Sequence, residues 1–205
     1  MIAANIIAEY GKADIRGRVV VIIKNYPNFI EMLDGYEHSL AVVIHDEKVC
    51  NKRIEKGDPG IRVSSTKLSD PVFDQVSAIV ENEQAIRAAD FESGFLRGTD
   101  RTLFFKRQIQ TCFIMQEDFG FFHDGLMALN DEERQIFQDY ISGRKSMQAV
   151  ADAMCIGYDT ARKKIRNYRR LVMDQTGFFM QLRDEQRRIQ NESTVGMITQ
   201  PLKVA

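Results

Sequence analysis

Apolar residues recur along most of this chain at the three- and four-residue spacing of α-helices, and the alternation typical of strands is scarce. From residue 2 to residue 24 this spacing predicts helix, with a short strand as the alternative for the β-branched run 19–23. Pro27 suits the first turn of a following helix, and the glycines and proline of 57–60 predict its end.

Two further helices are predicted in the middle of the chain. Asp70-Pro71 is a helix start, and apolar residues follow it at helical spacing as far as Ile86. Gly94 and Gly98 predict an interruption before the second helix, whose apolar positions are Leu103, Phe104, Ile109, Cys112, Phe113 and Phe119. We expect the aromatic stretch 113–122 to be core, with a partner-binding surface as the alternative.

After residue 129 the helix boundaries become sharp. Asn130 and Glu133 have the three-residue spacing of a capping box, in which each side chain accepts a hydrogen bond from the other residue's backbone. Ser142-Gly143 predicts the end of that helix, and Ser146 suits the N-cap of a second, short one.

A tight turn at 155–157 then leads into a third helix that begins near Tyr158. The residues expected on the inner faces of the three helices are Ile136, Phe137, Tyr140, Val150, Ala151, Met154, Ala161, Ile165 and Tyr168. Three short helices with apolar inner faces predict a trihelical unit.

The third of these helices is strongly basic, although the chain as a whole has 28 basic and 29 acidic residues. Residues 158–170 include one acidic residue, Asp159, and six basic ones: Arg162, Lys163, Lys164, Arg166, Arg169 and Arg170. A cationic helix that follows a small turn suits the DNA major groove, where basic side chains meet phosphates and polar ones meet base edges. The alternative is a packing unit with a basic face toward solvent.

This orientation predicts a set of DNA-binding residues along the helix. They are Tyr158, Asp159, Thr160, Arg162, Lys163, Arg166, Asn167, Arg169 and Arg170. We expect the first turn and a half to contact bases and the later arginines to hold phosphates. Asp159 has two interpretations: it accepts a hydrogen bond from a cytosine amine, or it caps the helix.

The spacing of Ser146, Val150-Ala151, 154–157 and 160–162 resembles the S-x-x-x-I-A-x-x-L-G-I-S-x-x-T-V-K pattern of region four of bacterial sigma factors. Cys155 stands where that pattern has a turn glycine, and Gly157 stands where it has a capping serine. No counterpart of sigma region two is evident. The order of parts resembles phage and prophage activators of the RinA and ArpU type, which implies promoter binding by the C-terminal unit and assembly or polymerase contact by the helical part.

Other kinds of site find little support in the residues. The three cysteines form no C-x-x-C pair, which argues against a zinc site and fits reduced thiols in the cytoplasm. His38 and His45 are seven residues apart and could share a helix face, but two histidines alone do not complete a metal site. No catalytic motif is present, and 19–23 is too short to span a membrane. We therefore expect no enzyme activity, metal, cofactor or membrane association.

Together these patterns predict an all-α protein with three parts. Residues 1–127 form a helical assembly or partner region, 128–176 form the helix-turn-helix unit, and 177–205 form a polar extension with a last helix over 183–191 and a loose tail over 193–205. The predicted function is sequence-specific regulation of transcription on double-stranded DNA, with RNA polymerase as a further candidate partner and a homodimer as a candidate assembly. The alternatives are a small terminase-like packaging subunit and a polymerase-binding protein that does not bind DNA.

Overall fold

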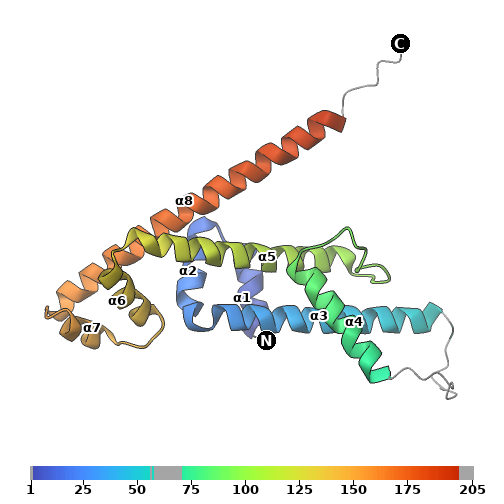
Figure 1. Ribbon diagram of the computed structural model, residues 1–205, viewed down its shortest axis with the longest axis horizontal. Coiled ribbons are helices and arrows are strands. Elements are labelled where there is room, and N and C mark those ends of the chain that lie inside the picture. The colour runs from blue at the N-terminus through green and yellow to red at the C-terminus, as the bar shows by residue number, and fades with distance from the viewer. Residues whose placement is uncertain (1, 56, 58–70, 199–205) are drawn as a thin grey trace, which may run out of the picture. The chain divides into compact units, whose positions relative to one another are not determined.

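A computed structural model describes residues 2–55, 57 and 71–198, and within these ranges the chain is all-α, as predicted (Figure 1). The described elements are α1 (Ile2–Tyr10), α2 (Ile15–Asn25), η1 (Tyr26–Asn28), α3 (Phe29–Glu55), α4 (Pro71–Arg87), α5 (Thr102–Gly125), η2 (Leu126–Ala128), α6 (Asp131–Ile141), α7 (Met147–Ala153) and α8 (Tyr158–Ile198). No helix in the described ranges is both long and apolar enough to cross a lipid bilayer.

The chain divides into two compact units that do not follow its linear order. The first unit takes Met1–Lys12 and Asn28–Glu117, and the second takes Ala13–Pro27 and Asp118–Ala205. This division differs from the predicted ranges 1–127, 128–176 and 177–205, because α2 and the last part of α5 pack with the C-terminal helices.

The first unit is built on the contact of α3 with α4, and its core extends to the first part of α5. That core consists of Leu40, Ala41, Ile44, Ile86, Leu96, Phe105 and Ile109. The expected inward positions Leu103 and Phe104 are exposed, whereas Phe105 is fully buried. The expected positions Ile109 and Cys112 are fully buried, so the prediction is wrong only at the start of the helix, where three consecutive apolar residues leave the direction of the face undetermined.

The β-branched run 19–23 is helical, so the alternative of a strand is wrong. Val19, Val21, Ile22 and Ile23 are buried within α2, which contacts α8 in the second unit. Both glycine interruptions are confirmed, since Gly94 and Gly98 have left-handed φ angles of 73° and 83° between α4 and α5. The helix start at Pro71 is confirmed, while Asp70 and the turn residues 58–60 lie outside the described residues.

The longest element is α8, which runs for 41 residues without a break. The predicted separate helix over 183–191 is part of it, and the predicted loose tail is helical from 193 to 198, while 199–205 lie outside the described residues. Gly177 does not end the helix. The inner face of α8 stays buried on both sides of Gly177, and this packing outweighs the roughly 1 kcal/mol that a mid-helix glycine costs.

Candidate nucleic-acid interface

The helix ends around the candidate interface are fixed by local hydrogen bonds. At the start of α6 the Asn130 side chain accepts a hydrogen bond from the backbone of Glu133 at 2.9 Å, and the Glu133 carboxylate accepts from the backbone of Asn130 at 3.4 Å. The predicted capping box is therefore confirmed. Ser146 caps α7 by accepting from the backbone of Ala149 at 3.2 Å, also as predicted.

Helices α6, α7 and the first part of α8 contact one another around an apolar centre. Its buried residues are Phe137, Val150, Ala151, Ala161, Ile165 and Tyr168, all of which the sequence placed on inner faces. Ile136, Tyr140 and Met154 are half-buried at its edge. The hydroxyl of Tyr168 faces Glu133, and burial together with that carboxylate raises the pKa of Tyr168.

The connection from α7 to α8 is a Schellman turn with a cysteine at its left-handed position. The backbone N–H of Cys155 donates to the Asp152 carbonyl, and that of Ile156 donates to the Ala151 carbonyl, both at 3.1 Å. Cys155 has a φ of 54°, a region in which glycine is the usual residue. Cys155 thus replaces the turn glycine of the sigma pattern, yet its backbone adopts the left-handed conformation that favours glycine.

Basic residues in the α6–α7 part of this unit form ion pairs with neighbouring carboxylates. Arg134 pairs with Asp131, while Arg144 and Lys145 pair with Asp139 at 3.0 and 3.1 Å. The hydrogen bond from Lys145 lowers the pKa of Asp139 despite its low exposure. Arg144 and Lys145 hold the loop after α6 in place, and because they share one carboxylate they keep one net positive charge between them.

The start of α8 is different. The nine predicted DNA-binding residues are Tyr158, Asp159, Thr160, Arg162, Lys163, Arg166, Asn167, Arg169 and Arg170. Arg169 is half-buried, and the other eight are exposed. In the described part of the chain no carboxylate lies within ion-pair distance of Arg162, Lys163 or Arg166. Arg170 donates to the Asn167 side chain at 2.7 Å, which fixes these two side chains together.

The basic side chains divide between two faces of α8. Arg162, Arg166 and Arg169 line a concavity of about 220 Å³ that is also bounded by apolar residues of α2, α6 and α7. Lys163, Asn167 and Arg170 lie on the opposite side of α8 from the buried stripe, as their helical spacing from Ala161 and Ile165 requires. The exposed cationic surface therefore wraps about half of the helix.

A buried ion-pair network holds α8 in place within the second unit. Asp118, near the end of α5, is fully buried; it bonds to Arg183 of α8 and lies 3.7 Å from Arg18 of α2. Arg183 also pairs with Asp184 at 2.9 Å and lies over the ring of Phe121. Removing one member of such a network leaves a buried charge uncompensated, so it ties α2, α5 and α8 together.

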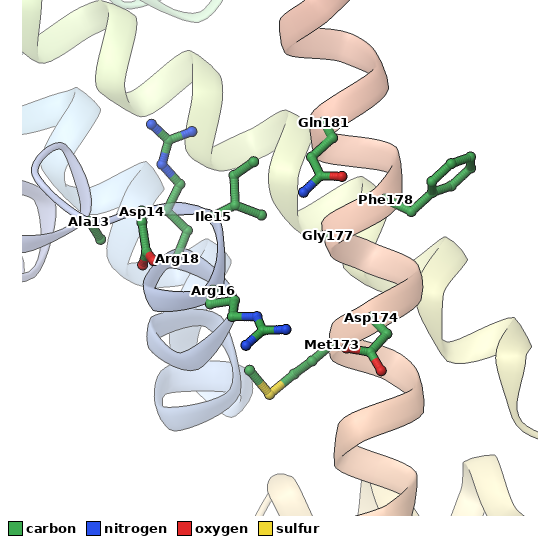
Figure 2. Close-up of a pocket in the computed structure, with 10 residues that line it drawn as sticks. All are labelled: Ala13, Asp14, Ile15, Arg16, Arg18, Met173, Asp174, Gly177, Phe178 and Gln181. Carbon is green, nitrogen blue, oxygen red and sulfur yellow. The ribbon is translucent and has the colours of Figure 1, made fainter.

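One basic residue near the interface escapes prediction from the sequence. Arg16 of α2 lines a concavity of about 340 Å³ together with Arg166, Arg169 and Arg170. It also borders a neighbouring hollow of about 550 Å³ between the start of α2 and the middle of α8 (Figure 2). Some 150 residues separate Arg16 from these arginines in the sequence, and Lys12 and Arg18 are the only basic residues within four positions of it.

Metal-ligating side chains do not converge in the part of the chain that the structure describes. No group of three or more histidine, cysteine or acidic residues there is placed to hold a metal ion. His38 lies 3.5 Å from Glu83. Cys50 and Cys155 are exposed thiols, whereas burial raises the pKa of Cys112 to about 12.

Comparison of the chain with family models, with curated proteins and with solved structures finds no match.

Proposed function

We propose that this protein binds double-stranded DNA sequence-specifically and regulates transcription, without enzymatic activity, as a phage or mobile-element activator similar in kind to the RinA and ArpU type. The observation that carries the proposal is the exposed basic surface at the start of α8, where Arg162, Lys163 and Arg166 have no carboxylate partner among the described residues. Unpaired cations on one helix face provide the electrostatic attraction that DNA phosphates require.

In this proposal α6, α7 and α8 act as a helix-turn-helix unit, with α8 entering the major groove. The first turns of α8, around Arg162 and Lys163, contact base edges, because a recognition helix presents its N-terminal residues there. Arg166, Arg169 and Arg170 hold the phosphates on either side. The Schellman turn at Cys155 sets the direction in which α8 leaves α7.

The first unit has a separate role in this proposal. Its described surface carries exposed apolar side chains, among them Phe73 and Leu103, which are 69% and 75% exposed. We assign it to assembly or to contact with RNA polymerase, as the resemblance to phage activators implies. In this proposal DNA contact and partner contact therefore belong to different compact units of the chain.

Selection of bound duplexes from a random pool, followed by titration of the recovered sequence, tests the proposal. Arg162→Glu should weaken binding to that sequence by about fivefold or more, since one base contact contributes about 1–3 kcal/mol. Arg107→Glu is the matched control, because Arg107 is also exposed but lies on α5 within the first unit. Both variants should keep the parent melting temperature.

Failure to recover any sequence, or equal binding by Arg162→Glu and the parent, would contradict the proposal. The mass of the assembly in solution separates the proposed regulator from the packaging alternative. A terminase-like subunit forms rings of many copies, whereas the regulator is expected as a monomer or dimer.

A further inference from the structure

Four arginines from two helices far apart in the sequence meet in one concavity. Arg16 comes from the first turn of α2, and Arg166, Arg169 and Arg170 come from α8; Met173 and Asp174 complete the lining. Both helices belong to the second compact unit and contact each other. The concavity, of about 340 Å³, is large enough for a phosphate group and its nearest waters.

The position of Arg16 is fixed by its neighbours on α2. Asp14 caps the helix by accepting from the backbone of Gly17 at 2.8 Å. Arg18 pairs with the buried carboxylate of Asp118, which also binds Arg183 of α8. Figure 2 shows Arg16 on the side of α2 that faces Met173 and Asp174, so α2 directs this guanidinium toward α8.

The charges around the concavity do not balance. Four guanidinium groups line it, and Asp174 is the one carboxylate in the lining. Among the described residues no carboxylate lies within ion-pair distance of Arg16, Arg166 or Arg169. Gathering like charges is unfavourable unless an anion binds between them, and the planar fork of arginine matches the oxygens of a phosphate.

We propose that this concavity binds a backbone phosphate of the DNA, with Arg16 of α2 as a phosphate contact outside the predicted helix-turn-helix unit. The inference rests on the proposed function. Arg166 to Arg170 lie four to eight residues beyond Arg162, which is about 6–12 Å along the helix axis. A phosphate held there flanks the bases that the start of α8 contacts, and Arg16 extends the DNA-binding surface onto α2.

The test measures binding of the full chain to the selected duplex and to a scrambled duplex across a range of salt concentrations. Arg16→Gln should weaken binding to both duplexes by a similar factor of at least threefold, because a phosphate contact carries no sequence information. It should also lower the slope of log Kd against log salt by about one. Arg16→Lys should retain most of that slope, and Arg107→Gln should match the parent.

Arg16 is exposed, so Arg16→Gln should fold like the parent, which its melting temperature checks. An unchanged Kd and salt slope for Arg16→Gln, with Arg162→Glu still impaired, would overturn the inference and leave the proposed function standing. If the parent itself binds neither duplex, the proposed function is overturned.

Inorganic tripolyphosphate serves as the second probe, because a free polyphosphate offers the same chemistry as the DNA backbone. If it binds the parent and not Arg16→Gln, while duplex binding by Arg16→Gln is unchanged, the ligand is a free polyphosphate and the DNA assignment is wrong. Competition between tripolyphosphate and duplex that disappears in Arg16→Gln would support the DNA phosphate.

Discussion

Gly125 lies where the end of α5 approaches α8 too closely for a side chain, and Gly125→Ala should therefore destabilise the second unit. A Cβ atom at this position would lie 2.2 Å from the Thr176 hydroxyl oxygen and 3.2 Å from both the Thr176 nitrogen and the Val172 carbonyl oxygen. Thr176 is fully buried, and rotation of its side chain could relieve the 2.2 Å contact but not the two backbone contacts at 3.2 Å, which require the helices to move apart by a few tenths of an ångström.

The size of the effect follows from two opposing terms. Overpacking a well-packed contact costs about 1–3 kcal/mol. Replacing a helical glycine by alanine returns about 0.5–1 kcal/mol, and less at the last residue of a helix. We expect a net loss of about 1–2 kcal/mol for Gly125→Ala.

Gly120→Ala is the matched control, because Gly120 lies on the same helix and a Cβ there would meet no atom within 4 Å. That variant should gain about 0.5–1 kcal/mol. Native-state hydrogen exchange of α8 amides reports on the second unit alone, and it should separate the two variants by about 1.5–3 kcal/mol. Thr176→Ala should recover part of the loss when combined with Gly125→Ala. A Gly125→Ala variant as stable as Gly120→Ala would refute the close approach of α5 and α8.

Two further predictions concern a strained turn and a buried acid. Cys155→Gly should stabilise the second unit by up to about 1 kcal/mol in urea unfolding, because glycine adopts the φ of 54° without steric cost; a loss of stability would show that the thiol contributes more than the backbone strain. In the first unit, burial raises the pKa of Glu37 from 4.5 to about 7, although Arg87 opposes the shift. The folded unit thus binds a proton that the unfolded chain releases, so the parent should lose up to about 3 kcal/mol as the pH rises from about 4.5 to 7. Unfolding of the parent and of Glu37→Gln at pH 5 and pH 8 measures this: the pH dependence should be absent in the variant, and a parent that gains stability over that range would contradict the assignment.

Local signals were sufficient for the helix boundaries of the candidate interface. Asn130 and Ser146 form their caps with residues three positions away, so the sequence alone shows both partners of each hydrogen bond. The same holds for the basic surface of α8, because residues on one helix keep a fixed angular order whatever the helix packs against. The DNA-binding residues proposed here therefore stand on sequence and helix geometry together.

Only the tertiary structure shows which segments far apart in the sequence contact each other. The continuity of α8 through Gly177 depends on contacts with α2 and η2, and no local pattern around a mid-helix glycine reveals them. Burial of Phe105 rather than Phe104 depends on the helices that surround α5 in the first unit. Arg16 joins Arg166 and Arg169 because α2 packs against α8, a contact to which Arg18 and Arg183 contribute through the buried carboxylate of Asp118. A long-range contact is stabilised by burial and charge pairing between segments that are far apart in the sequence. The spacing of residues within one segment does not identify the distant segment that it contacts.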